Sequence, residues 1–299
     1  MSKELFFNVG VAGKNQDFLL AGLFYEYEGT DTEVTRVVGC EDGNDWFHIA
    51  DADGIVIALL DFRRAGKLHT MAVSRKGEVA TIVGEARSDA QIPIDPGFLF
   101  DAVAIGSDVF ACGSNHQVWR WLGRDWEQAG QGAGINARRG ATHALYGLCA
   151  VSANEVYAVG TKGTIVRFDG RAWDAIDSPT NVGLHKILRT RNDQLVVVGR
   201  SGQVFRGSSA TGWTSLAIAG VKDNFWGLCQ YRDDVYCSTP STLYRIEADG
   251  LKEVSAPNAP KRFTRLFAND SFLWATTGTD AFHRFDGKAW SELVCPENE

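Results

Sequence analysis

The fold is decided by one stretch of the sequence, Val156-Tyr-Ala-Val-Gly-Thr-Lys-Gly-Thr-Ile-Val-Arg-Phe-Asp-Gly-Arg-Ala-Trp173. It contains short apolar segments that end at turns, and an Asp-Gly pair between two such segments is a strong signal for a β-hairpin. The same ending returns near the C-terminus as Arg284-Phe-Asp-Gly-Lys-Ala-Trp290. The stretch therefore indicates a repeated unit of short antiparallel strands.

Two kinds of residue mark the period of this repeat. An arginine ends a short apolar strand at Arg120, Arg167, Arg206, Arg245 and Arg284, with spacings of 47, 39, 39 and 39 residues. A tryptophan follows four of these arginines, at Trp126, Trp173, Trp213 and Trp290. Each unit also has an apolar segment upstream, so it contains four short strands joined by tight turns, the pattern of a β-propeller blade.

The ends of the chain favour a propeller over a linear solenoid. A solenoid needs polar caps, but the last unit keeps its apolar pattern as far as Leu293-Val294-Cys295. We predict an all-β, closed β-propeller of four-stranded antiparallel blades that forms a single domain over residues 1–299. The regular blades cover 98–134, 143–180, 182–220, 221–258 and 259–296, and the longer first spacing is absorbed by the insertion Gly130–Thr142.

Residues 1–97 are predicted to form degenerate blades. One comprises Phe18–Tyr27 and Val34–Val38, and a second with irregular strands comprises Trp46–Leu60, Leu68–Val73, Glu78–Val83 and Gln91–Ile94. This gives seven blades, and six blades with an elaborated N-terminal segment is the alternative.

Composition and motifs exclude several function classes. The net charge of −7 argues against general nucleic-acid binding, which needs a basic footprint. Met1–Gly10 lacks the features of a secretory signal, and no apolar run is long enough to span a membrane, so we expect a cytoplasmic protein. The six cysteines and six histidines lack metal-ligand spacing, which predicts buried free thiols, no metal and no cofactor. Asp51-Ala-Asp53-Gly54 hints at calcium but is better explained as a plain turn, since the other ligands are missing.

The repeated arginines and tryptophans have a functional and a structural interpretation. Five guanidinium groups can bind anions, and exposed tryptophans at this period can form a glycan-binding girdle. A residue that recurs at one strand position in every blade more often serves the blade itself. We therefore expect the arginines to stack on a tryptophan or pair with a turn carboxylate, and the tryptophans to pack between blades.

The loops offer a better candidate for a binding site. If the turns between second and third strands share a face with the connections between blades, that face carries basic residues at Arg138, Arg139, Lys162, Arg200, Lys222, Lys261 and Arg262. Such a positive patch favours an acidic partner and speeds its encounter. The alternative is that these side chains are scattered and solvated. An acidic group near the N-terminus is either a second contact surface or a solubilising edge; it comprises Glu26, Glu28, Asp31, Glu33, Glu41, Asp42 and Asp45.

The unit Val156–Trp173 resembles bacterial BNR-like and photosystem-assembly-factor-like propeller repeats, although it lacks the Ser-x-Asp-x-Gly-x-Thr-Trp box of sialidases. The segments Ser178-Pro-Thr-Asn-Val-Gly-Leu and Asp223-Asn-Phe-Trp-Gly-Leu resemble uncharacterised propellers encoded near type VI secretion toxin clusters. This resemblance implies an immunity protein that neutralises a cognate bacterial toxin by occlusion. The alternatives are a glycan hydrolase or lyase, which needs convergent carboxylates near the propeller axis, and a lectin that uses the repeat tryptophans.

Overall fold

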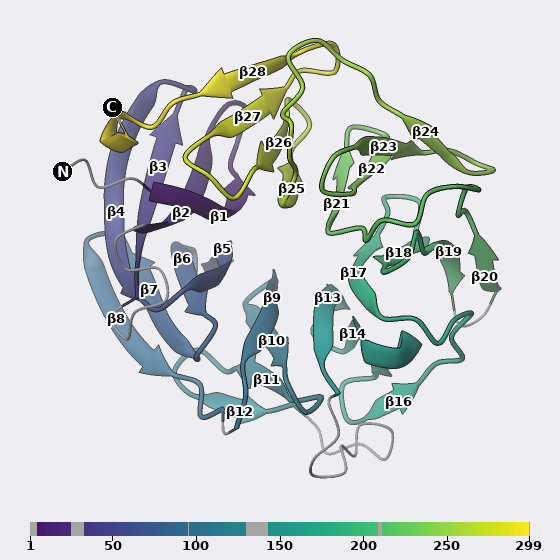
Figure 1. Ribbon diagram of the computed structural model, residues 1–299. Helices are drawn as coiled ribbons and strands as arrows, with labels where there is room; N and C mark the ends of the chain where they lie inside the picture. Colours follow the sequence, from purple (N-terminus) through teal and green to yellow (C-terminus); the bar gives the residue numbers. More distant parts are fainter. Residues whose placement is uncertain (1–4, 25–32, 95, 130–142, 209–210, 299) are drawn as a thin grey trace. The chain divides into compact units, whose positions relative to one another are not determined.

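The computed structural model describes residues 5–24, 33–94, 96–129, 143–208 and 211–298, and their strands form seven four-stranded antiparallel sheets. In each sheet the four strands follow one another along the chain. The chain divides into two compact units, Met1–Leu59 with Phe225–Glu299, and Leu60–Asn224. The strands are labelled in Figure 1.

The first unit holds three of the sheets. Blade 1 contains β1 (Leu5–Ala12), β2 (Phe18–Phe24), β3 (Val34–Glu41) and β4 (Asp45–Asp53). Blade 6 contains β21 (Gly227–Tyr231), β22 (Asp234–Ser238), β23 (Leu243–Ile246) and β24 (Leu251–Glu253). Blade 7 contains β25 (Arg265–Ala268), β26 (Leu273–Thr276), β27 (Phe282–Phe285) and β28 (Trp290–Leu293), and is followed by the 3-10 helix η3 (Pro296–Asn298).

The second unit holds the other four sheets. Blade 2 contains β5 (Val56–Arg64), which begins in the last residues of the first unit, β6 (Lys67–Ser74), β7 (Glu78–Val83) and β8 (Ala86–Gln91). Blade 3 contains β9 (Leu99–Ile105), β10 (Asp108–Gly113), β11 (Val118–Trp121) and β12 (Trp126–Gln128). Blade 4 contains β13 (Leu145–Ser152), β14 (Glu155–Gly160), the 3-10 turn η2 (Thr161–Gly163), β15 (Ile165–Phe168) and β16 (Trp173–Ala175). Blade 5 contains β17 (Leu184–Arg189), β18 (Leu195–Gly199), β19 (Val204–Ser208) and β20 (Gly212–Ser215).

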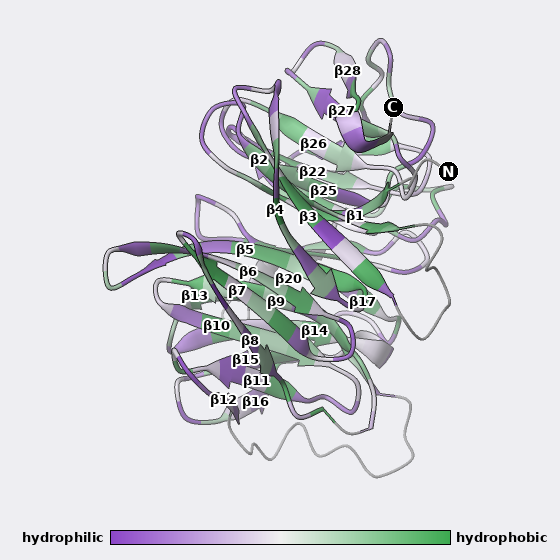
Figure 2. Ribbon diagram, turned by 90° about the vertical axis from the view of Figure 1, so that its left-hand side faces the viewer, coloured by the Kyte–Doolittle hydropathy of each residue, from purple (hydrophilic) through white to green (hydrophobic). Residues whose placement is uncertain are grey.

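The burial of the strands follows from their place in a blade. Second strands are apolar almost throughout, and β14 is buried from Val156 to Gly160, because its alternate residues pack in one cluster with blade 3 and in another with blade 5. Fourth strands are mostly exposed and polar, as in β16 and β24, which leaves short outer edges that resist pairing with other chains. Figure 2 shows hydrophobic residues concentrated on the strands and hydrophilic residues in the loops. The predicted all-β propeller of four-stranded antiparallel blades is confirmed, with seven blades rather than six.

The predicted strands of the N-terminal third are partly wrong. The prediction missed β1, although its alternate burial at Leu5, Phe7 and Val9 is a period-two pattern. It also joined Trp46–Leu60 into one strand. The chain instead turns at Gly54, whose φ of +75° suits glycine, so Trp46 belongs to blade 1 and blade 2 begins at Val56.

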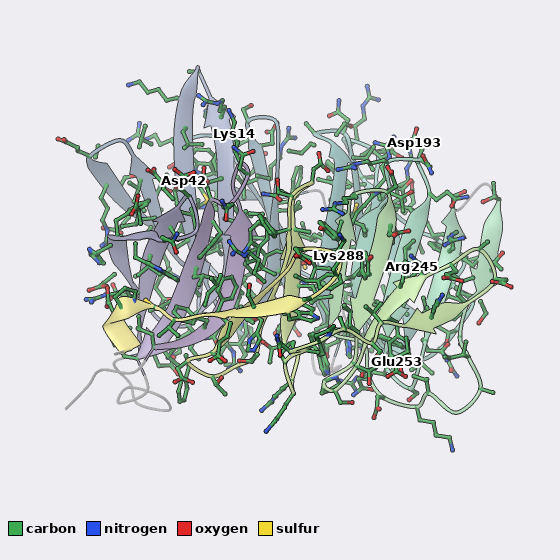
Figure 3. The ribbon with its side chains drawn as sticks, turned by 90° about the horizontal axis from the view of Figure 1, so that it is seen from above. Lys14, Asp42, Asp193, Arg245, Glu253 and Lys288 are labelled. Atoms are coloured by element: carbon green, nitrogen blue, oxygen red, sulfur yellow. The ribbon has the colours of Figure 1, made fainter. Side chains whose placement is uncertain are left out.

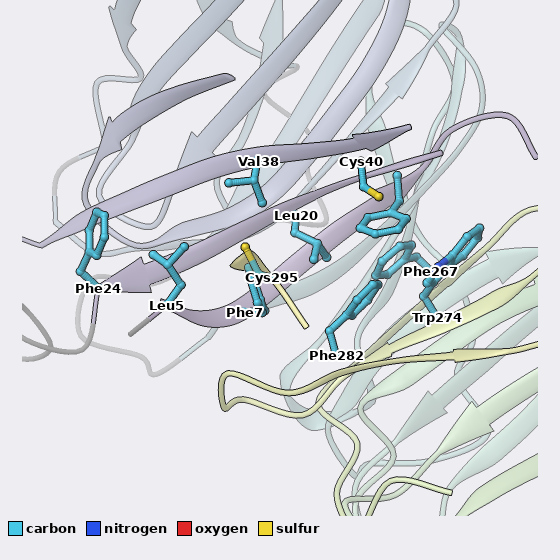
Figure 4. Close-up of a cluster of buried hydrophobic side chains, with 11 residues drawn as sticks. Leu5, Phe7, Leu20, Phe24, Val38, Cys40, Phe267, Trp274, Phe282 and Cys295 are labelled. Carbon is cyan, nitrogen blue, oxygen red and sulfur yellow. The ribbon is translucent and has the colours of Figure 1, made fainter. Parts of the chain in front are cut away.

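Within the first unit, blade 1 packs directly against blade 7. Trp274, Phe282 and Phe18 lie in one buried cluster that joins the two blades (Figure 4). The Phe7 N–H donates to the Thr279 carbonyl at 3.1 Å, which adds a backbone hydrogen bond between the blades. Each of these blades is built from one continuous stretch of chain, so no N-terminal strand completes blade 7.

Three of the five repeated arginines form an ion pair within their own blade. Three pair with a carboxylate at the start of the second strand: Arg120 with Asp108 at 3.1 Å, Arg167 with Glu155 at 3.1 Å and Arg245, labelled in Figure 3, with Asp234 at 3.5 Å. Of the two predicted roles, these three arginines show the carboxylate pair. Where a guanidinium lies over a ring, the ring is a phenylalanine, as for Arg120 over Phe110 and Arg284 over Phe272. Arg120, Arg167 and Arg245 therefore stiffen their own blades, whereas Arg284 Nη1 also donates to Gln16 Oε1 of blade 1 at 2.8 Å.

Three of the four repeated tryptophans, Trp173, Trp213 and Trp290, pack between blades as expected. The Trp173 indole N–H in blade 4 donates to the Ala129 carbonyl that follows blade 3, at 2.9 Å. The Trp213 indole in blade 5 donates in the same way to the Asp177 carbonyl after blade 4, at 3.1 Å. Trp290 is 2% exposed. Trp173 and Trp290 are buried and Trp126 and Trp213 are half-buried, so the four rings do not form the fully exposed row that a girdle needs.

All six cysteines are free and buried, as predicted. Burial raises the pKa of Cys40 and of Cys149 to about 11 in each case. None of the described segments contains a helix long and apolar enough to cross a membrane.

Candidate functional site

Tight turns between second and third strands carry part of the predicted basic patch. In blade 4 the turn places Lys162 at φ +55° and Gly163 at φ +72°, and in blade 5 it places Ser201 at φ +53° and Gly202 at φ +73°. A Cβ on Gly163 would clash with the Thr180 carbonyl, so glycine lets the turn approach the next connection between blades.

Hydrogen bonds join these turns to the connections between blades. The Arg200 N–H donates to the Gly183 carbonyl, and the Gly202 N–H donates to the Asp223 carbonyl, both at 2.9 Å. Within the second unit, the expected sharing of one face by turns and connections is therefore observed. This face presents Lys162, Arg200 and Lys222, and all three residues are exposed.

An aromatic row runs from this face along the first strands of blades 3 to 5. Phe100 meets Tyr146 edge-on at 5.1 Å between ring centroids, and Tyr146 meets His185 at 5.8 Å. The Arg200 Nε lies 3.4 Å from His185 Nε2. These rings come from β9, β13 and β17 and are half-buried or buried. The row gives the basic face a rigid apolar border, which sequence patterns did not reveal because its members differ from blade to blade.

Below the row, one ion pair ties blade 3 to blade 5. Lys186 Nζ lies 2.8 Å from Asp101 Oδ1, and Asp101 Oδ2 accepts the Leu148 N–H at 3.0 Å. The pair passes β13 at Gly147, where a Cβ would clash with the His185 carbonyl. The face is therefore held on three cross-linked strands.

Blade 3 departs from its neighbours at the equivalent turn. His116, at φ +55°, occupies the place of Gly163 and Gly202 and stacks on His143 with ring centroids 5.3 Å apart. His116 Nε2 and His143 Nδ1 are buried without hydrogen-bond partners. Burial, with a smaller effect of His143, lowers the pKa of His116 to about 4. His116 is therefore neutral at pH 7.

In the first unit, Lys261 and Arg262 line a cavity of about 440 Å³. One wall is the connection between blades 6 and 7, from Asn258 to Arg262, and another is the turn between β26 and β27. Both basic residues are exposed and have no ion-pair partner in the described part of the chain. Two of the predicted residues thus lie at a built cavity, which we call the blade 7 pocket.

The rest of the blade 7 pocket was not predicted. Thr277, Thr279 and Ala281 come from the turn, and His283 and Glu292 from the paired strands β27 and β28. The two threonine hydroxyls lie 2.8 Å apart, and Thr277 Oγ1 donates to the Ala281 carbonyl at 2.7 Å. His283 Nδ1 is buried without a partner, and burial lowers the pKa of His283 while Glu292 opposes that shift.

Two predicted basic residues, Arg138 and Arg139, lie outside the described residues, as do Glu26, Glu28 and Asp31 of the acidic group. The structure brings together Lys162, Arg200 and Lys222 in one unit, and Lys261 with Arg262 in the other.

The contacts of the carboxylates bear on the glycan-enzyme hypothesis. Burial raises the pKa of Asp61, which accepts a hydrogen bond from the Thr70 hydroxyl at 2.6 Å, and Asp101 is held by Lys186. In the described part of the chain neither of these two is in contact with a second carboxylate, whereas glycoside hydrolysis uses a facing pair. Among the described residues, no group of three or more His, Cys, Asp and Glu side chains is arranged to hold a metal ion.

Comparison with known proteins gives one relative in sequence. The chain is 30% identical over 199 residues to the immune protein Tsi7 of Pseudomonas aeruginosa, a match that covers 66% of this chain and 64% of the relative. The match thus spans a little under two thirds of the relative's length. No family model matches the chain.

Solved structures share the architecture at low identity. The Cps50 (Swd1) propeller domain of Myceliophteria thermophila has a TM-score of 0.68 at 12% identity, covering 96% of this chain and 98% of its own. YCF48 bound to D1 peptide, a photosystem assembly factor, has a TM-score of 0.67 at 14% identity, covering 95% and 93%. An inactive virginiamycin B lyase from Staphylococcus aureus with quinupristin has a TM-score of 0.66 at 12% identity, covering 87% and 88%. The chain thus has the seven-bladed β-propeller fold and sequence similarity to an immune protein.

Proposed function

We propose that this chain is a non-enzymatic, protein-binding propeller that acts as an immunity protein and neutralises a cognate bacterial toxin by covering its active surface. The observation that carries the proposal is the 30% identity to an immune protein over 199 residues. The propeller fold supports it, because a rigid scaffold with projecting loops binds a protein with little ordering cost.

The exposed basic turns support an acidic partner surface. Lys162 and Lys222 have no ion-pair partner among the described residues, so a partner's carboxylates meet them without first displacing an internal ion pair. Arg200 lies beside the aromatic row, where a guanidinium and an aromatic edge together suit a binding hot spot. Charge complementarity of this kind speeds association and selects the partner.

The proposal also covers the contact residues, the compartment and the source of the toxin. We assign partner contact to Arg138, Arg139, Lys162, Arg200, Lys222, Lys261 and Arg262. We also assign the chain to the cytoplasm as a single propeller domain with BNR-like repeats, and its toxin to a type VI secretion system. Nucleic acid and membrane are not proposed as partners.

A pull-down tests the proposal. The tagged chain is co-expressed with the product of the neighbouring gene, and the complex is washed at rising salt. A stable one-to-one complex that weakens as salt rises is expected, because exposed charges are screened. If the product of the neighbouring gene does not co-purify with the tagged chain at low salt, the proposed function is wrong.

A further inference from the structure

Several polar groups that line the blade 7 pocket have no hydrogen-bond or ion-pair partner among the described residues. Lys261 and Arg262 stand at its edge without an internal carboxylate, and His283 Nδ1 lies buried in its wall without a partner. A buried imidazole nitrogen without a partner is costly, so such a group in a native structure calls for an explanation. An occupant of the pocket can reach the two exposed cations, Lys261 and Arg262, whereas His283 Nδ1 itself is covered.

The charges in the pocket restrict the chemistry of that occupant. Lys261 and Arg262 supply two positive charges and Glu292 one negative charge, so the lining is positive overall. The carboxylate of Glu292 is exposed and can only accept hydrogen bonds at pH 7. A matching ligand therefore has an anionic group for the two cations and an N–H donor for Glu292.

An acidic residue within a peptide has both groups. Its carboxylate is planar and suits the fork of Arg262, and its backbone N–H is a donor. The volume of about 440 Å³ accommodates one such side chain with its flanking peptide bonds and is at the lower end of ligand pockets. Free phosphate offers no N–H donor and leaves Glu292 facing an anion.

We propose that the blade 7 pocket receives a single acidic side chain, with its peptide backbone, from a loop of the protein partner. In this arrangement the carboxylate binds Lys261 and Arg262, and the backbone N–H binds Glu292. The proposal rests on the proposed function and specifies the chemistry of one contact. It makes the pocket one anchoring point for the partner.

The test uses small probes and needs no toxin. Nα-acetyl-glutamate amide is titrated into the ¹⁵N-labelled chain, and amide shifts are followed at Lys261, Thr279 and Ala281. Saturable shifts are expected, with Nα-acetyl-glutamine amide at least about tenfold weaker, since a charged hydrogen bond is lost. The double variant Lys261→Ala/Arg262→Ala should lose the response, whereas Lys288→Ala should keep it, because Lys288 is exposed on the same blade outside the pocket.

Three outcomes overturn the proposal. The first is equal binding of the glutamate and glutamine probes, and the second is the absence of any saturable shift. The third is binding of acetate or inorganic phosphate as tight as that of the glutamate probe, which identifies a simple anion site. None of these results affects complex formation in the pull-down. A chain that binds its protein partner but not the probe refutes only the pocket assignment.

Discussion

The ion pair between Asp101 and Lys186 gives the sharpest stability prediction, because it joins strands of two non-adjacent blades. The two side chains keep only 13% and 19% of their exposure and lie 2.8 Å apart. Breaking a fully buried pair costs about 3 to 5 kcal/mol, since one charge is left without its partner. The residual exposure here reduces that figure, so we expect Asp101→Asn to lower the free energy of unfolding by about 2 to 3 kcal/mol.

A double-mutant cycle separates the pair from its surroundings. Lys186→Met alone should cost about 2 kcal/mol, but the double variant with Asp101→Asn should cost clearly less than the sum of the two single variants. Urea denaturation followed by tryptophan fluorescence measures the free energy in each case. Asp193→Asn is the matched control, because Asp193 (Figure 3) is 74% exposed in its pair with Arg189 and should change the free energy by less than about 0.5 kcal/mol. Additive costs for the two substitutions, or an Asp101→Asn variant as stable as the control, would refute the reasoning.

Three further predictions concern buried side chains. The pKa of His116 falls from 6.5 to about 4 on folding, so the unfolded chain binds the proton first as pH is lowered. The free energy of unfolding should therefore drop by up to about 3 kcal/mol between pH 6.5 and pH 4. His116→Gln should flatten this part of the stability profile, and an unchanged slope would refute the assignment. Trp173→Ala should cost about 3 to 5 kcal/mol in urea denaturation, whereas Trp126→Ala, at a half-buried position, should cost less; equal costs would contradict the packing account. The six cysteines should resist a thiol reagent in the native chain and all react in urea, and rapid reaction of Cys40 in the native state would count against its burial.

The repeat could be predicted from sequence because packing between neighbouring blades requires the same kind of side chain at the same position of each blade. Trp173 and Trp213 each donate to a carbonyl after the preceding blade, so the indole recurs at the same phase. The strand β1 was missed because the arginine and tryptophan of blade 1, Arg36 and Trp46, lie ten residues apart and so fall outside the regular spacing, which leaves the alternating pattern of β1 as its signal.

The candidate site was only partly predictable. Lys162 and Arg200 follow strands that end in glycine, and this shared feature located their turns. The threonines, His283 and Glu292 of the blade 7 pocket lie close together only because β27 pairs with β28 and the turn folds over them. One signal was present, since blade 7 has Thr277 where blades 3 to 5 have Gly113, Gly160 and Gly199, each seven residues before the repeat arginine. A residue at which one blade differs from the others is therefore the sequence signal that indicates a binding position.

The central claim, that this chain neutralises a protein toxin through its basic turns, is tested most directly by growth protection. Cells that express the neighbouring toxin gene are given either the native chain or the triple variant Lys162→Glu/Arg200→Glu/Lys222→Glu. The account predicts full growth with the native chain and loss of protection with the variant, although the variant folds with an unchanged urea midpoint. Growth arrest despite abundant native chain would contradict the claim of immunity. Equal protection by a folded triple variant would contradict the assignment of these turns.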